Sequence, residues 1–245
     1  MQTIIDDLLT NYDILGKNNK SGVLILHGWG HNLNSWLPIA NLLSTKHKVY
    51  LVDLPGFGSS YLSNQSFDTY DYAILVTKFI RKMKLKNYTL IGHSFGGKIA
   101  IVLASRQNSI KKLFLVSPSG INERSFLTML KIQISKIIKF AYPVLPVRFS
   151  EKVYSTFAAK DYKTAGPLKD TFKKVVAQNV VREAKKIKVP TIIFWGEEDK
   201  ELEPKYALRL RNLIKKSHVR IVWKTGHSPH IEDPNKFYGM VTEYL

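Results

Sequence analysis

The sequence predicts an α/β fold: a doubly wound, mostly parallel sheet with helices on both faces and a helical lid inserted between two core strands. Three observations lead to this expectation. Short apolar runs alternate with stretches of helical periodicity, the runs are apolar at successive positions, and one long segment carries no strand pattern. Strands that helices cover on both faces have this uninterrupted apolar character.

The predicted strands are short runs rich in β-branched and aromatic residues, bounded by turn formers. They lie at 23–26, 49–52, 88–91, 113–116, 191–194 and 220–223. Amphipathic helices are predicted at 69–83, 97–105 and 204–214, the last with Pro204 near its first turn. Strands that alternate with helices in this way become parallel neighbours joined by helical crossovers.

The alternation stops once, between residues 121 and 188, where helices are predicted at 125–142, 151–157 and 167–186. We therefore divide the chain into an α/β core, formed by 1–120 and 189–245, and a helical lid at 121–188. One face of the first lid helix is apolar, which suits packing on the core. An insert at the carboxyl edge of a parallel sheet also covers any site that lies there.

Composition excludes several classes of protein. The 245 residues are 44% hydrophobic, enough for one large domain, and include no cysteine. Disulfides, a thiolate nucleophile and cysteine-bound metals are therefore excluded, in keeping with a reducing compartment. The amino terminus carries acids where a secretory signal carries bases, and no apolar stretch is long enough to span a bilayer. We expect an uncleaved cytoplasmic protein without a transmembrane segment.

The strongest motif is G-x-S-x-G, formed by Gly92, Ser94 and Gly96 directly after the run 88–91 and before a predicted helix. A strand, a sharp turn and a helix in this order form a nucleophile elbow. The glycines permit a strained turn that lifts the serine hydroxyl above the sheet edge. The alternative is an ordinary glycine-rich connection, which we set aside because the other residues of a serine hydrolase site follow.

A serine nucleophile needs a histidine base that a carboxylate orients. His227 lies in a turn-rich loop after the last predicted strand, with His230 as its rival. For the carboxylate we choose Asp199, with Glu198 second, because both follow the strand 191–194. The order of serine, acid and histidine along the chain is the one expected for this architecture.

An oxyanion requires hydrogen-bond donors, which we expect to be the amides of Phe95, in the elbow, and Trp29, in the loop after the first strand. His27, in the same loop, is expected to brace it. Asp53, after the next strand, is expected to form a structural turn by bonding local backbone. The sequence has no ligand-spaced metal cluster and no phosphate-binding glycine loop, so we expect neither a metal nor a cofactor.

Five strings carry a resemblance to the α/β-hydrolase superfamily over essentially the whole length of the chain. They are HGWG at 27–30, DLPGFGSS at 53–60, GHSFGG at 92–97, GEED at 196–199 and GHSPHIEDP at 226–234. The resemblance implies Ser94 as nucleophile, His227 as base and Asp199 as its partner. It also implies an oxyanion hole made by the amides of Trp29 and Phe95.

Within the superfamily, HGWG followed by Asn32, together with DLPGFG, is most similar to the pimeloyl-acyl-carrier-protein methyl ester esterases of biotin synthesis. That similarity implies a serine carboxylesterase that works through an acyl-enzyme. Two alternatives keep the triad: a hydrolase of carbon–carbon bonds, and a lysophospholipase or lipase. A third alternative is a non-catalytic ligand-binding protein of the same fold.

The net charge is +18, and its density is about threefold higher in the predicted lid than elsewhere. Residues 121–188 hold 15 Lys and Arg against 5 Asp and Glu, while the other 177 residues hold 22 against 14. A basic lid suggests an acidic acyl carrier protein or an anionic lipid surface as partner. Biased composition alone is the alternative. No motif that reads nucleic acid accompanies the charge, so we expect no nucleic-acid partner. We also expect a monomer.

Overall fold

The described residues form one sheet of eight strands, in the order β1-β2-β4-β3-β5-β6-β7-β8. The structure, a computed structural model, describes residues 1–62, 65–121 and 164–245. Strands β3 to β8 pair in parallel and β1 and β2 add an antiparallel edge, which confirms the predicted fold class. The strands are β1 (Gln2–Ile5), β2 (Leu8–Leu15), β3 (Gly22–Leu26), β4 (Lys48–Val52), β5 (Tyr88–His93), β6 (Ile110–Val116), β7 (Thr191–Gly196) and β8 (Ser217–Val222).

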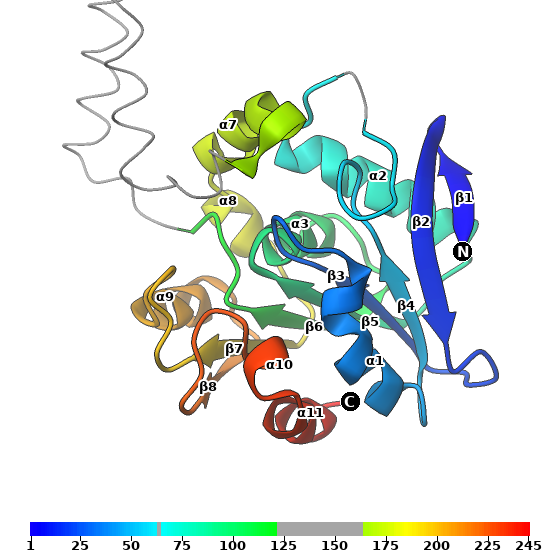
Figure 1. Cartoon of the computed structure of the whole chain (residues 1–245). Coiled ribbons are helices and arrows are strands. Elements are labelled where there is room, and N and C mark those ends of the chain that lie inside the picture. The colour runs from blue at the N-terminus through cyan, green and yellow to red at the C-terminus, as the bar shows by residue number, and fades with distance from the viewer. Residues whose placement is uncertain (63–64, 122–163) are drawn as a thin grey trace, which may run out of the picture.

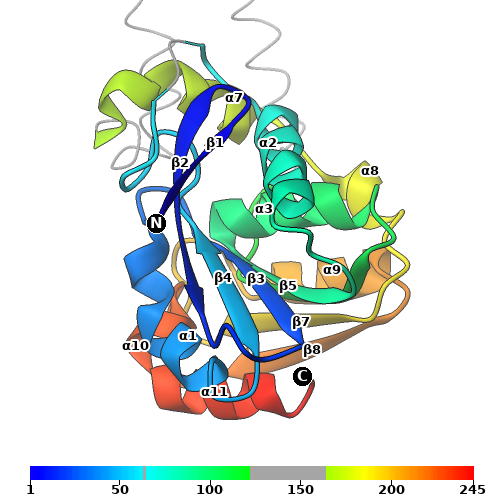
Figure 2. The same cartoon turned by 90° about the vertical axis from the view of Figure 1, so that its right-hand side faces the viewer.

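Helices cover both faces of this sheet, as Figure 2 shows most clearly. They are η1 (Leu33–Trp36), α1 (Leu37–Leu43), α2 (Thr69–Lys82), α3 (Ser94–Ala104), η2 (Gly166–Leu168), α7 (Lys169–Ala177), α8 (Val181–Ala184), α9 (Lys205–Leu213), α10 (Pro229–Glu232) and α11 (Pro234–Thr242). No helix among the described residues is both long and apolar enough to cross a bilayer.

The alternation of side chains along each strand sends neighbouring residues into two separate cores. Leu24 and Leu26 of β3 pack with α2, α3, α8 and α9, while Val23 and Ile25 pack with α1 and α11. Both sets are buried, which explains why the predicted strands are apolar at every position. In Figure 1 the arrowhead of β4 points toward α7, and the carboxyl terminus lies at the opposite end of the molecule.

The observed elements differ from the predicted ones in several places. The hairpin β1–β2 was not predicted, and its two-residue turn places Asp6 and Asp7 at φ +53° and +62°. Positive φ at both turn residues matches the right-handed twist of the flanking strands. Helix α3 begins at Ser94 itself, three residues before the predicted start at 97.

The predicted helix at 167–186 is broken into α7 and α8. Gln178 adopts an extended conformation after α7, and the carbonyls of Val175 and Gln178 accept hydrogen bonds from Lys98 Nζ at 2.5 and 2.8 Å. Lys98 lies on α3 and is buried, so it fixes the end of α7 to the helix that follows Ser94. The helices predicted at 125–142 and 151–157 lie outside the described residues.

His27 connects two loops at the carboxyl edge of the sheet. Its Nε2 accepts from the amide of Leu54 at 3.0 Å, so Nδ1 carries the proton and donates to the Gly28 carbonyl at 2.8 Å. Burial lowers the pKa of His27 to about 4, which keeps the ring neutral. This geometry agrees with the bracing role expected from the sequence.

Asp53 has a wider role than the local turn that the sequence predicts. Its buried carboxylate accepts from the amide of Leu33 at 2.7 Å, the amide of Ser59 at 2.9 Å and Nδ2 of Asn11 at 2.8 Å. A Cβ on Gly58 would lie 2.1 Å from its Oδ2, so the turn closes tightly around the carboxylate. Asp53 therefore ties β2 and η1 to the loop after β4.

We predict that Asp53→Asn lowers the free energy of unfolding by about 2–4 kcal/mol, because the amide group turns a donor toward buried N–H groups that need an acceptor. Urea denaturation followed by circular dichroism measures the loss. Asp7→Asn is the matched control, and the exposed turn position should change stability by less than about 0.5 kcal/mol. Equal stabilities for the two variants would contradict this role for Asp53.

Candidate active site

Ser94 occupies a strained turn between β5 and α3, with φ at +47°. A non-glycine residue in this conformation costs about 1–3 kcal/mol unless its surroundings impose it. Here the surroundings are close-packed: a Cβ on Gly92 would lie 2.6 Å from the Gly96 carbonyl oxygen, and a Cβ on Gly96 would lie 2.4 Å from that of Leu26. The backbone has the geometry that the G-x-S-x-G motif predicts.

His227 and Asp199 contact each other at the same edge of the sheet. The Nδ1 atom of His227, in the loop after β8, lies 2.8 Å from Oδ2 of Asp199, in the loop after β7. Oδ1 of Asp199 accepts from the amides of Glu201 and Leu202 at 2.9 and 2.8 Å, and the residue is only 5% exposed. Asp199 is therefore the acid hydrogen-bonded to Nδ1 of His227, whereas Glu198, the second choice from the sequence, is exposed.

Glu232 holds the loop that carries His227 in place, and the sequence analysis did not predict this role. Its carboxylate accepts from the amide of Gly226 at 2.5 Å and from the amide of Ser228 at 2.9 Å, the residues on either side of His227. The loop also packs on the end of β7, because a Cβ on Gly196 would lie 1.9 Å from the Gly226 carbonyl oxygen. Glu232 belongs to the string GHSPHIEDP, but its contacts are visible only in the folded loop.

The pKa of His227 is raised above its ordinary value of 6.5. Burial is the largest single influence and lowers this pKa, but the hydrogen bond and negative charge of Asp199, together with the charges of Glu201 and Glu232, outweigh it. Oε2 of Glu201 lies 3.8 Å from Nε2 of His227, on the side of the ring away from Asp199. The surroundings therefore favour the imidazolium form of this histidine.

His230, the rival base, has a packing environment. It is fully buried, its ring stacks on Trp36 with centroids 3.9 Å apart, and neither ring nitrogen has a hydrogen-bond partner among the described residues. Burial, and then the charges of His31 and His227, hold its pKa well below the ordinary range. A neutral ring without a partner suits the core rather than proton transfer.

His93 links the elbow to the loop that carries His227, and this role was also not predicted from the sequence. Its Nε2 lies 3.0 Å from the main-chain carbonyl oxygen of His227. A carbonyl only accepts, so the Nε2 proton is donated and Nδ1, which is buried, has no partner among the described residues. Burial, with the charges of His230 and His227, lowers the pKa of His93 well below its usual range and keeps it neutral.

The structure thus brings His227 and Asp199 together and joins their loop to the elbow through His93. Within the described part of the chain, no hydrogen bond connects the Ser94 hydroxyl to His227. Contacts of this kind are often long without substrate and shorten when the reacting complex forms. Ser94 and His227 therefore belong to segments in contact, with the last bond of the expected triad unformed.

The loop with Trp29 lies against the elbow. A Cβ on Gly28 would lie 2.7 Å from Nδ1 of His93 and 3.5 Å from Cβ of Ser94. Phe95 stands at the amino end of α3, where the first amides of a helix have no intrahelical acceptor. Neither its amide nor that of Trp29 donates a hydrogen bond to another described residue. Both amides are free to bind an oxygen of a ligand.

Aromatic side chains surround Trp29. Its ring centroid lies 5.0 Å from that of Phe57, 5.6 Å from that of Phe95 and 5.0 Å from that of Phe172. Phe172 belongs to α7, in the part of the predicted lid that the structure describes. The far side of the site differs sharply in character, because residues 197–203 hold five acids and one lysine.

Comparisons with known proteins agree with this geometry. Residues 23–161, more than half of the chain, match the model of the α/β hydrolase fold family. Monoacylglycerol lipase ABHD6 of Rattus norvegicus is 28% identical over 263 aligned residues, which cover 96% of this chain and 78% of the lipase.

Two solved structures also match. The crystal structure of a membrane phospholipase A, a bacterial virulence factor, has a TM-score of 0.81 and 25% identity, and the match covers 100% of this chain and 84% of the phospholipase. An esterase from Exiguobacterium antarcticum has a TM-score of 0.78 and 21% identity, covering 100% and 99%; this similarity concerns the fold. The protein is a hydrolase of the esterase or lipase type, and its chain belongs to the α/β hydrolase fold family.

Proposed function

We propose that this protein is a serine hydrolase that cleaves the carboxylic ester of a neutral monoacyl lipid, such as a monoacylglycerol. The observation that carries the proposal is the 2.8 Å contact between His227 and Asp199 beside a serine held at φ +47°. The three segments that bear these residues end at one edge of the sheet. The relatives that hydrolyse lipid esters support the same reaction class.

In the proposed mechanism, the Ser94 hydroxyl attacks the ester carbonyl while Nε2 of His227 takes its proton. Asp199 holds the Nδ1 proton, which leaves Nε2 free to act as base. The amides of Trp29 and Phe95 donate to the oxyanion of the tetrahedral intermediate. His227 then gives its proton to the departing alcohol, and water hydrolyses the acyl-enzyme by the same steps.

Three features support a neutral lipid over an acidic carrier protein. The relatives described above are lipases and an esterase, and none of them is a pimeloyl-acyl-carrier-protein esterase. The aromatic residues around Trp29 offer apolar surface for an acyl chain. Two of the five acids of 197–203, Asp199 and Glu201, contact His227, and like charges disfavour an acidic partner at that side.

The finer expectations from the sequence stay proposals. We propose that residues 121–188 act as a lid over Ser94, because α7 within them contacts Trp29 through Phe172. A monomeric cytoplasmic enzyme without a metal or cofactor remains our expectation. A role in biotin synthesis rests on HGWG, Asn32 and DLPGFG alone.

We predict that Ser94→Ala lowers kcat/KM for 1-monoacylglycerols and for p-nitrophenyl butyrate by about 10³-fold or more, because the nucleophile is lost. A fluorophosphonate probe should label the wild type and the matched control Ser105→Ala, whose serine lies at the end of α3, but not Ser94→Ala. Activity of Ser94→Ala within a few-fold of the wild type would contradict the proposal that Ser94 is the nucleophile. Faster cleavage of a pimeloyl methyl ester on acyl carrier protein than of monoacylglycerol would instead support the carrier-linked substrate.

We predict that the acidic limb of the kcat/KM profile lies above pH 6.5, because His227 must lose its proton to act as base and its pKa is raised. Glu201→Gln removes a charge that favours the imidazolium, so it should move this limb to lower pH. The move should be a few tenths of a pH unit at most and shrink with added salt, because Glu201 is exposed. A limb that moves upward, or salt that enlarges the move, would contradict this account.

His93 is a positioning residue in this proposal, because it holds the main chain of the base rather than the substrate. We predict that His93→Leu lowers kcat by about 10- to 100-fold with little change in KM, since small displacements of a reacting group have effects of this size. His93→Gln keeps an N–H donor at similar reach and should recover much of kcat. Thermal unfolding of both variants separates positioning from loss of fold, and equal kcat values for the two would rule positioning out.

A further inference from the structure

We propose that the amino-terminal edge of the parallel sheet is a docking surface for an anionic phospholipid bilayer. Each of the strands β3 to β8 has two or three lysines at its start or in the few residues before it. These segments, which we call the lysine edge, are 17–20, 46–48, 84–86, 111–112, 185–188 and 215–216. They hold thirteen lysines and no aspartate or glutamate.

The opposite edge of the same sheet has the opposite charge. The described loops that follow the strands hold nine acids against two lysines, in segments 27–36, 53–62, 65–68, 117–121, 197–204 and 223–233. Parallel pairing places all strand starts at one edge and all strand ends at the other. The loops of the core are therefore polarised, positive at the lysine edge and negative where they follow the strands, whereas α7 beside Trp29 adds three lysines and one aspartate.

Few charges of the lysine edge have a partner; Lys112 is one that does, because its Nζ donates to the main-chain oxygens of Tyr244 and Leu245, the latter at 3.0 Å. Among the described residues, none of its lysines forms an ion pair with an aspartate or glutamate, and eleven of the thirteen are exposed. Lysines 185, 186 and 188 were counted with the predicted lid, yet they lie after α8 and lead into β7. These three positive charges, which the sequence analysis assigned to the lid over Ser94, thus lie at the other end of the sheet.

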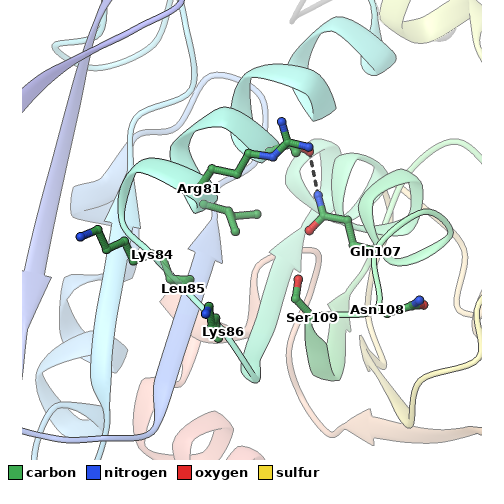
Figure 3. A pocket seen from close by; sticks show the side chains of 9 residues that line it. Arg81, Lys84, Leu85, Lys86, Gln107, Asn108 and Ser109 are labelled. Carbon is green, nitrogen blue, oxygen red and sulfur yellow. Dashed lines mark hydrogen bonds between the residues drawn. The ribbon is translucent and has the colours of Figure 1, made fainter.

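The lysine edge is a broad surface and not a small-anion site. A pocket of about 710 Å³ borders it at segment 84–86, between the end of α2 and the segment before β6. Figure 3 shows that the side chains of Arg81 and Lys84 at this pocket extend in different directions instead of meeting around one point. A bound phosphate group requires converging donors, whereas a charged sheet of head groups requires only charge density.

The chemistry of the edge favours a bilayer over a protein or a nucleic acid. The large exposed apolar side chains of the described residues, among them Trp223 and Tyr61, lie outside the lysine edge. Protein interfaces have aromatic anchors at their centres, and single-stranded nucleic acid is bound by aromatic stacking. Lysine is also a point charge without the planar fork by which arginine reads phosphates and bases.

Docking at the lysine edge leaves Ser94 on the side away from the bilayer, because Ser94 follows β5 at the opposite edge of the parallel sheet. A single acyl chain binds a bilayer only marginally and reversibly, so a monoacyl ester reaches a site that faces water. The inference about docking does not depend on the proposed chemistry, since no residue of the site takes part.

The test is co-sedimentation with vesicles of phosphatidylcholine alone and of equal parts phosphatidylcholine and phosphatidylglycerol. We expect binding only to the second kind, and loss of binding between about 0.01 M and about 1 M salt, where the Debye length falls from about 30 Å to about 3 Å. A fourfold variant at the lysine edge should bind at least about tenfold more weakly, because each lysine near such a surface contributes about fivefold. Its changes are Lys86→Gln, Lys111→Gln, Lys186→Gln and Lys215→Gln.

The matched control loses the same net charge elsewhere, through Lys78→Gln, Lys174→Gln, Lys205→Gln and Lys236→Gln, and should bind like the wild type. Both variants should keep their melting temperature and their kcat on p-nitrophenyl butyrate, so a failure of the proposed chemistry is seen separately. Equal loss of binding in the control would reduce the effect to net charge and overturn the proposal. Absence of binding to anionic vesicles, or binding to single-stranded RNA in its place, would overturn it as well.

Discussion

The close packing of the turn at Ser94 is the constraint on which the rest of the site depends. Gly96 lies so near the Leu26 carbonyl that no side chain fits between them, and this contact holds β5 and α3 against β3. The strain at Ser94, about 1–3 kcal/mol, persists because the buried residues on both sides of the turn prevent its backbone from relaxing to another conformation. A second close contact, between Gly28 and the side chains of His93 and Ser94, brings the loop of Trp29 against the elbow, so the serine and the free amides are fixed by neighbouring parts of one packed turn.

The second half of the site is held by hydrogen bonds rather than by packing alone. Asp199 is fixed through two amides of its own loop, and Glu232 is bonded to the amides on either side of His227. His93 then connects that loop to the elbow at 3.0 Å. The acids that orient His227 also raise its pKa, so one arrangement sets both the position and the proton affinity of the histidine.

Residues directly after buried strands could be predicted because their placement depends on local pattern alone. Ser94 and Asp199 follow apolar runs that parallel pairing brings to one edge, and the order of the runs is visible in the sequence. The break between α7 and α8 could not be predicted, since it depends on Lys98, which lies 77 residues before the carbonyl it bonds. The hairpin β1–β2 was missed because its strands are half exposed and lack an apolar run.

The distribution of charge also depends on the fold and could not be predicted from local sequence. Along the chain the lysines of the lysine edge are separated by whole strand and helix units, so no local window contains more than three of them. Parallel pairing adds these small groups into one surface, just as it gathers Ser94, Asp199 and His227 at the opposite edge. The single figure of +18 therefore hides a polarity among the described loops, in which acids raise the pKa of the base at one edge while lysines lie at the other, where they can meet an anionic partner.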